Sequence, residues 1–152
     1  MKPPEVEIRP AAPEDVPDVV HSYAWLFAPP GRGPPNWNEQ RAAESLGRLI
    51  SSPDSSVFVA SSEGLMVGLE IVYLDIESVR FGRRAWIEDL AVHPDFRSRG
   101  IGKLLLEEAK RWGRAHGATH LELETGEGRI DAQRFYEREH PVSRSKCYRW
   151  EL

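Results

Sequence analysis

The sequence predicts a mixed α/β domain in which helices cover both faces of a central, mostly antiparallel sheet. Two observations carry this prediction. Apolar runs joined by a short turn fill the middle of the 152-residue chain, which indicates hairpins of antiparallel strands. Nearer the C-terminus, strand patterns alternate with helix patterns, which indicates neighbouring parallel strands joined by right-handed crossovers.

The first third of the chain predicts one strand and two helices. "VEIRPA" at 6–11 is typical of a short strand, and apolar residues recur at helical spacing over 13–27. The proline- and glycine-rich stretch at 28–35 ends that helix. A second helix is predicted over 36–50, where asparagines supply a start signal.

The middle of the chain predicts three strands. "SSVFVASS" at 55–62 and "LMVGLEIVYLDI" at 65–76 flank Glu63-Gly64, a pair typical of a hairpin turn. "RAWIEDLAV" at 84–92 is a further strand, which His93-Pro94 closes. These strands are expected to pair in antiparallel order.

The last third predicts two helices and two strands. A helix is expected from about Gly100 to His116, with Gly117 as its stop. "THLELET" at 119–125 alternates as a half-buried strand does, and "RIDAQRFYERE" at 129–139 is a short helix. "SKCYRWEL" at 145–152 is predicted as a final strand, in which Cys147 is expected to be a small core residue.

Composition and charge limit the classes of protein to which the chain can belong. Charged residues make up 29% of the chain and the net charge is −4, which argues against a nucleic-acid-binding protein. The sequence shows no signal peptide, no apolar run of membrane-spanning length, no repeat and no linker, so residues 1–152 are expected to form one cytoplasmic domain. His116 and His120 are separated by the helix-ending Gly117, so no metal site is expected.

The turn before the third predicted helix gathers positive charge and glycine. Residues 97–102 read "RSRGIG", so Arg97 and Arg99 directly precede Gly100 and Gly102. The first turn of a helix carries amide groups without intrahelical partners and the positive end of the helix dipole. Glycines there leave the backbone open to an anion. The pattern therefore predicts a phosphate-binding site, against the alternative of a plain helix start with surface arginines.

Two common phosphate-binding motifs do not match. A Walker loop needs Ser or Thr after its Gly-Lys pair, whereas Leu104 follows Lys103 here. A dinucleotide-binding fingerprint needs a third glycine, and Leu105 stands in its place. The residues alone thus predict a site for a phosphate group, but they do not identify the ligand that contains this group.

The stretch "LAVHPDFRSRGIGKLLLEEA" resembles the acetyl-CoA-binding signature of the GNAT N-acetyltransferase superfamily, R/Q-x-x-G-x-G/A. The resemblance covers the whole chain. "IRPAAPEDVPDVV" is similar to the family's first strand and helix, and "DAQRFYERE" is similar to its late helix with a tyrosine. The resemblance implies a pair of parallel strands that splay apart to admit acetyl-CoA, and no metal.

The family's binding residues carry over to two segments. The backbone of Leu90, Ala91 and Val92 is implied to bind the pantetheine arm of acetyl-CoA. Backbone amides of the motif are implied to hold the pyrophosphate, and these belong to Arg97, Ser98, Arg99, Gly100, Ile101, Gly102 and Lys103.

The resemblance also implies catalytic groups. Tyr136 stands where many relatives have the tyrosine that protonates the CoA thiolate, although a core aromatic beside Phe135 is the alternative. Glu88 is our choice of general base, with Asp89 or a chain of waters as alternatives. Strand alternation places Glu88 and Asp89 on opposite faces, with Glu88 on the face of Leu90.

The chain departs from the family at two places. Arg129 precedes the late helix where many relatives have Asn, and His140-Pro141 stands where they have Gly-Phe. Trp25 and Trp37 flank the proline-rich loop and either line an acceptor pocket or pack against that loop.

The resemblance implies an N-acetyltransferase that moves the acetyl group of acetyl-CoA directly to a primary amine of a small molecule or peptide. The alternative is a non-catalytic acyl-CoA-binding module that regulates a partner. The family's habits leave a homodimer open, and neither nucleic acid nor membrane is an expected partner.

Overall fold

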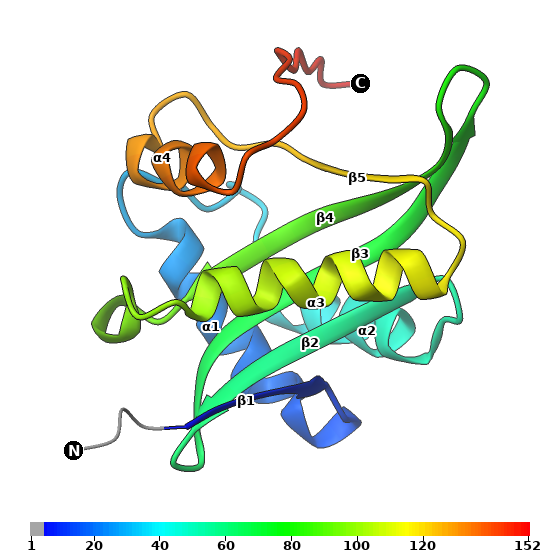
Figure 1. Ribbon diagram of the computed structural model, residues 1–152. Helices are drawn as coiled ribbons and strands as arrows, with labels where there is room; N and C mark the ends of the chain where they lie inside the picture. Colours follow the sequence, from blue (N-terminus) through cyan, green and yellow to red (C-terminus); the bar gives the residue numbers. More distant parts are fainter. Residues whose placement is uncertain (1–4) are drawn as a thin grey trace.

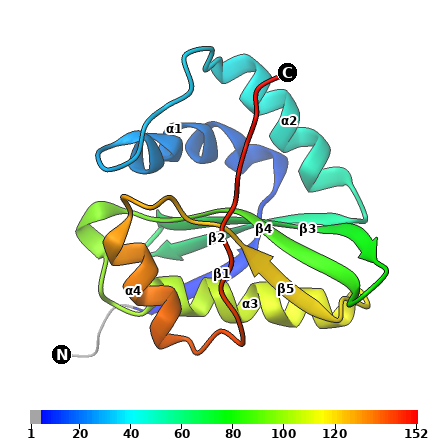
Figure 2. The same cartoon turned by 90° about the horizontal axis from the view of Figure 1, so that it is seen from above.

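A computed structural model describes residues 5–152 and confirms the predicted fold class, because a five-stranded sheet carries helices on both faces (Figures 1 and 2). The strands are β1 (Val6–Pro10), β2 (Ser55–Ser62), β3 (Leu65–Ser78), β4 (Gly82–Val92) and β5 (His120–Leu123). The helices are α1 (Val16–Phe27), α2 (Glu39–Ser51), α3 (Ile101–Ala115) and α4 (Ile130–Arg138), with 3-10 turns at Pro13–Asp15 and Pro94–Phe96.

The sheet follows chain order, β1-β2-β3-β4-β5. The first three pairings are antiparallel, whereas β4 and β5 are parallel and are joined through α3. This is the mixed topology that the sequence predicts, because hairpins build the middle and a strand–helix–strand passage adds the last strand.

Each face of the sheet has its own apolar cluster. Helices α1 and α2 cover one face, and α3 and α4 lie on the other (Figure 2). Gly68 of β3 lets α3 come close, since a Cβ atom there would lie 3.1 Å from Leu105 Cδ1. The predicted start of α2 is also explained, because the Asn38 side chain accepts a hydrogen bond from the Arg41 amide at 2.9 Å.

The predicted final strand is wrong. Residues 145–152 form neither a helix nor a strand, and Cys147 is exposed rather than in the core. A strand needs a hydrogen-bonded neighbour, and this segment pairs with no strand within residues 5–152. Strand propensity is a local property of the segment and does not supply that partner.

Candidate active site

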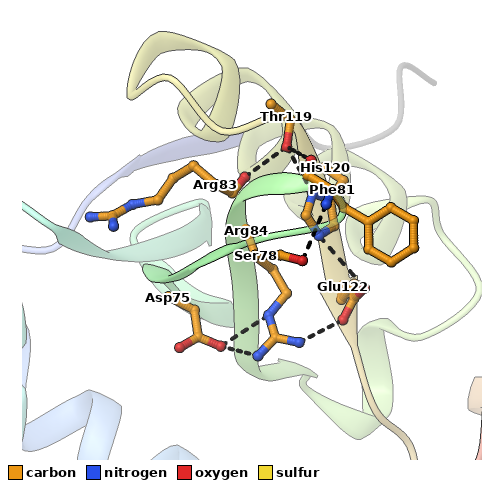
Figure 3. Close-up of polar contacts among 8 residues, drawn as sticks. All are labelled: Asp75, Ser78, Phe81, Arg83, Arg84, Thr119, His120 and Glu122. Carbon is orange, nitrogen blue, oxygen red and sulfur yellow. Dashed lines mark hydrogen bonds and ion pairs between the residues drawn. The ribbon is translucent and has the colours of Figure 1, made fainter.

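Polar contacts fasten β5 to β4 at one end of their pairing (Figure 3). The Arg84 guanidinium donates to Asp75 and, at 2.9 Å, to Glu122 Oε2 of β5. The Thr119 hydroxyl donates to the Arg83 carbonyl at 3.0 Å. These contacts hold the beginning of β5 in register and leave its end free to diverge.

Beyond that end the two parallel strands separate (Figure 1). Ile87 and Leu123 are the last paired residues, whereas β4 continues beside β3. The backbone groups of Leu90, Ala91 and Val92 that point toward β5 therefore have no strand partner. A free strand edge inside the fold can bind an extended, amide-containing ligand by adding to the sheet.

The start of α3 lies next to that free edge in sequence and offers unpaired amides. Its first helical hydrogen bond runs from the Leu104 amide to the Gly100 carbonyl (3.1 Å), so the amides of Ile101, Gly102 and Lys103 have no partner within the helix. The first turn contains no acidic residue. Such a helix start is suited to a phosphate.

The two glycines of the motif have different roles. Gly100 has a φ of +83° and open space where a Cβ would lie, so it is required for its backbone conformation. Gly102 adopts ordinary helical geometry, and its missing side chain faces Phe135 of α4 at about van der Waals distance. Of the two, only Gly100 is required by the backbone conformation of the turn.

Three cations surround this helix start. Arg97 Nε donates to the Val92 carbonyl at 3.3 Å, and the Arg99 guanidinium lies 4.9 Å from the centre of the Phe96 ring. Lys103 Nζ lies 3.8 Å from Glu139 of the segment after α4. Both arginine side chains are exposed, so they add positive charge without blocking the amides.

Tyr136 of α4 lies half-buried beside Phe135, with 5.0 Å between the ring centres. Burial raises the pKa of its phenol to about 12, the charge of Glu70 adds to this shift, and Arg129 opposes it. The phenol therefore holds its proton at neutral pH and is a proton donor.

A β-bulge corrects the expected placement of the two carboxylates. Ile71 lies opposite Asp89 but Val72 lies opposite Ile87, so Glu88 is the extra residue. Glu88 consequently turns to the α1 and α2 face together with Asp89, and not to the face of Leu90. The prediction from sequence required the side chains of the strand to alternate strictly between the two faces, and one inserted residue breaks that alternation.

Each carboxylate is held by neutral donors on this face. The Tyr23 hydroxyl donates to Asp89 Oδ2 at 2.6 Å. The Tyr73 hydroxyl and the Trp86 indole both donate to Glu88 Oε2, each at 3.1 Å. Burial raises the pKa of Asp89, the charge of Glu88 adds to this, and the Tyr23 hydrogen bond opposes it.

Aromatic rings from the loop after α1 adjoin the carboxylates. Trp37 packs against Tyr23 and Phe27, with ring centres 5.3 and 4.7 Å apart. Trp25 instead packs edge-on against His93 at 5.1 Å, away from this group. Of the two tryptophans considered from the sequence, Trp37 is therefore the one that contacts Tyr23, the hydrogen-bond donor to Asp89.

Arg129 joins the two sides of the site. Its guanidinium donates to the Leu26 carbonyl at the end of α1 at 2.7 Å. Its charge opposes the raised pKa of both Asp89 and Tyr136, so Arg129 lies near enough to act on each of them. The departure from the family at this position thus places a cation that contacts the end of α1.

A sequence model of the acetyltransferase (GNAT) family matches residues 19–140. The chain belongs to the GNAT acetyltransferase family. The match runs from within α1 to just past the end of α4, and so includes the free β4 edge and the start of α3.

Curated GNAT relatives share parts of the chain. It is 42% identical over 59 residues to the uncharacterized N-acetyltransferase YhdJ of Bacillus subtilis, covering 39% of this chain and 42% of that protein. It is 41% identical over 111 residues to streptothricin acetyltransferase A of the same organism, covering 68% of this chain and 63% of the relative. The chain thus matches less than two thirds of the length of either.

The GNAT fold is shown again by solved structures. The aminoglycoside N-acetyltransferase AAC(6')-Iy, in complex with CoA, superposes with a TM-score of 0.82 at 17% identity, covering 99% of this chain and 98% of the other. At that identity the likeness concerns the fold.

Sequence reasoning missed Glu70 in this GNAT domain. The residue is fully buried on β3, and neither carboxyl oxygen has a hydrogen-bond partner among residues 5–152. Burial raises its pKa well above the usual value, and the charge of Glu108 adds to that, so the folded protein favours the protonated form of Glu70. The signal was present, since Glu70 is the one charged residue in the apolar run from Leu65 to Leu74.

Two absences concern the described part of the chain. Residues 5–152 contain no group of three or more His, Cys, Asp or Glu placed to hold a metal ion. None of their helices is long and apolar enough to cross a membrane.

Proposed function

We propose that this GNAT domain is an acetyl-CoA-dependent N-acetyltransferase that moves the acetyl group directly to a primary amine. The observation that carries the proposal is the free edge of β4, which leads to an open helix start on one side and to a pair of carboxylates on the other. These features match the two substrates that such a reaction brings together.

Acetyl-CoA fits the first half of the site. The free backbone of Leu90, Ala91 and Val92 offers hydrogen bonds to the amides of the pantetheine arm. The backbone amides from Arg97 to Lys103 take the pyrophosphate, with Arg97 and Arg99 adding charge. The α4 helix, which contains Tyr136, packs through Phe135 against Gly102 at the start of α3.

The acceptor nitrogen loses two protons on its way from ammonium to amide, and the departing sulfur gains one. Glu88 accepts the proton of the incoming ammonium, so that the amine nitrogen can attack the thioester carbonyl. A backbone N–H of the free β4 edge polarises the carbonyl oxygen. The C–N bond forms first, and as the C–S bond then breaks, Tyr136 donates its phenolic proton to the sulfur. The nitrogen releases its second proton to solvent, and Tyr136 regains a proton from solvent.

Glu88 is the better base of the two adjacent carboxylates. Its Oε2 atom is fixed by Tyr73 and Trp86, while the side chain remains exposed to an acceptor and to solvent. Asp89 is more buried and already accepts a short hydrogen bond from Tyr23. We therefore assign Asp89 to binding the acceptor amine and Glu88 to its deprotonation.

The acceptor face favours a cationic small molecule. Two adjacent carboxylates attract an ammonium group, and the nearby rings of Tyr23 and Trp37 can stack against a cation. The streptothricin and aminoglycoside acetyltransferases among the relatives act on molecules of this class by their names. A peptide amine is the second acceptor to test.

The test is an acceptor screen. Purified protein is incubated with acetyl-CoA and a panel of polyamines, aminoglycosides, streptothricin, amino acids and peptides, and released CoA thiol is measured. We expect turnover with one or more cationic amines. Calorimetric binding of acetyl-CoA without turnover on any amine would instead support the non-catalytic acyl-CoA-binding module.

A further inference from the structure

A hydrogen bond joins two helices that lie on opposite faces of the sheet. At the beginning of α4, the Arg129 guanidinium donates through Nη2 to the Leu26 carbonyl near the end of α1, at 2.7 Å. Helix α1 covers one face and α4 lies on the other, and they meet past the point where β5 ends at Leu123 (Figures 1 and 2). The contact therefore lies at the end of the sheet where β4 and β5 diverge.

The end of α1 has carbonyl groups that need a donor. The last carbonyls of a helix have no intrahelical partner and form the negative end of the helix dipole. The last turn of α1 contains no basic residue. Arg129, which lies 103 residues after Leu26 in the chain, supplies both a donor and a positive charge there. The contact thus satisfies a requirement that the sequence of α1 leaves open.

Gly31 makes room for this contact. Its amide donates to the Ala28 carbonyl at 2.8 Å, so the chain turns back beside the end of α1. A Cβ atom at position 31 would collide with the Leu26 carbonyl oxygen and would lie 2.5 Å from Arg129 Nη2. Close approach of a backbone to another group is a common reason for glycine. A side chain at position 31 would therefore displace the guanidinium or the turn.

Backbone and side-chain hydrogen bonds hold Arg129 at the start of α4. The Arg129 amide donates to the Gly126 carbonyl, and the Gln133 amide donates to the Arg129 carbonyl, each at 3.0 Å. The Gln133 side chain also donates to the carbonyls of Gly126 and Glu127, at 2.9 Å each. Arg129 is thus fixed to the helix that contains Tyr136.

The segment 26–37, which Arg129 contacts, contains aromatic side chains of the acceptor face. Gly33 passes the Phe27 ring so closely that a Cβ atom there would lie 3.2 Å from it. At the end of the segment, Trp37 packs against both Phe27 and Tyr23. Tyr23 is the donor to the carboxylate that we assign to acceptor binding. The path of the segment therefore determines where these rings lie beside that carboxylate.

Hydrogen bonds of the segment are otherwise local. The amides of residues 28–37 donate only to carbonyls of residues 24–34 within the described chain. Among residues 5–152, the Arg129 side chain is the only side chain that hydrogen-bonds to the segment 26–37. Its contact with Leu26 is therefore the one such link from the described part of the chain that ties this segment to α4.

We propose that Arg129 is a positioning residue for acceptor binding, because it fixes the segment 26–37 and so keeps Phe27 and Trp37 against Tyr23. The inference rests on the acetyl transfer proposed above and adds a specificity-determining residue to it. Arg129 acts through the segment and need not touch the acceptor. Acetyl-CoA binding should not depend on it, since none of the residues 90–103 hydrogen-bonds to Arg129.

Two substitutions break the contact from opposite sides. Arg129→Gln removes the guanidinium, whereas Gly31→Ala keeps the charge and places a methyl group against the Leu26 carbonyl. Each should raise the KM for an acceptor from the screen by roughly 10-fold or more, while the acetyl-CoA dissociation constant stays within about twofold. Gly31→Ala should keep kcat within about threefold. The double variant should resemble the more affected single variant, because both changes remove the same contact.

Arg134→Gln and Gly128→Ala are the matched controls. Arg134 is exposed on α4, and its pair with Asp131 is long, at 3.9 Å. Gly128 directly precedes Arg129 and has open space where a Cβ atom would lie. Neither control should change the acceptor KM by more than about twofold.

Hydrogen exchange follows the segment without any acceptor present. The amides of Ala28 and Trp37, which donate within the segment and to the last turn of α1, should exchange roughly 5-fold or more faster in Arg129→Gln and Gly31→Ala than in the wild type and the controls. Unchanged exchange would overturn the inference, and so would faster exchange with an unchanged acceptor KM. A wild type that turns over no amine would instead refute the acetyl transfer, and the exchange rates would still show whether Arg129 fixes the segment.

Discussion

The carboxyl group of Glu70 lies in the apolar interior. Its cross-strand neighbours, Phe58 and Leu90, both belong to the cluster beneath α3. Leu90 is also the first residue of the free β4 segment proposed to bind acetyl-CoA. A buried polar group without a partner costs on the order of 1–3 kcal/mol, and Glu70 lies close enough to raise the pKa of Tyr136.

This burial predicts a distinct pH dependence of stability. The folded state keeps the Glu70 proton, whereas the unfolded chain releases it near pH 4.3, so the folded state binds more protons above about that pH. The free energy of unfolding should therefore fall with rising pH by up to ~1.4 kcal/mol per unit, until pH passes the raised pKa.

Glu70→Gln tests this, because an amide of similar shape cannot titrate. Chemical denaturation at pH 5, 6 and 7 should show the variant gaining stability over the wild type as the pH rises. Glu44→Gln, on the exposed face of α2, is the control and should follow the wild type. A constant difference between wild type and Glu70→Gln would show that Glu70 is ionised in the folded protein.

Glu88 and Asp89 predict separable kinetic effects. Glu88→Gln should lower kcat by roughly 100-fold or more, because the group that accepts the proton of the acceptor ammonium is gone. Asp89→Asn should chiefly raise the KM for the acceptor. Glu77→Gln, exposed on β3, is the control.

If Asp89→Asn lowered kcat and Glu88→Gln chiefly raised the acceptor KM, Asp89 would be the base and Glu88 the binding residue. Unchanged rates in both variants would point to deprotonation through water. The neighbouring Tyr23 and Tyr73 donors belong to different carboxylates, which is why the two substitutions are expected to differ.

At the scale of elements, the bulge in β4 and the start of α3 create the site. The motif from Arg97 to Gly102 and the helix that follows could be predicted from the sequence, because glycine at a helix start and an apolar stripe are local signals. The bulge could not be predicted, since it depends on how β3 and β4 pair across space. The bulge places Glu88 on the same face as Asp89, the face that α1 and α2 cover.

The two glycines at this helix start predict different stabilities. Gly100→Ala should cost about 1–2 kcal/mol, because a side chain at a φ of +83° is strained even with open space around it. Gly102→Ala should change stability by less than about 1 kcal/mol, since the helix gains propensity and the Cβ meets Phe135 at ordinary distance. Urea denaturation of both variants measures this.

The same two variants should differ in acetyl-CoA affinity if the strained turn positions the amides. Calorimetry is expected to show the larger loss for Gly100→Ala. Equal stabilities for the two variants would contradict the assignment of Gly100 as the residue that the turn requires.

At the scale of the whole molecule, the polar contacts around Arg84 fix one end of the parallel pair and the divergence of β5 opens the other (Figure 3). The sheet order and its two faces could be predicted, because each hairpin and crossover is short. The fate of residues 145–152 could not, since strand propensity is local and a pairing partner is not.

The central claim, acetyl transfer with Tyr136 as the acid, is tested most directly by Tyr136→Phe. With an acceptor from the screen, kcat should fall by roughly 100-fold or more while the acetyl-CoA dissociation constant stays within about twofold. Tyr148→Phe, in the exposed C-terminal segment, is the matched control and should retain the wild-type rate. An unchanged kcat in Tyr136→Phe would contradict the account, because the proton would then reach the sulfur by another route.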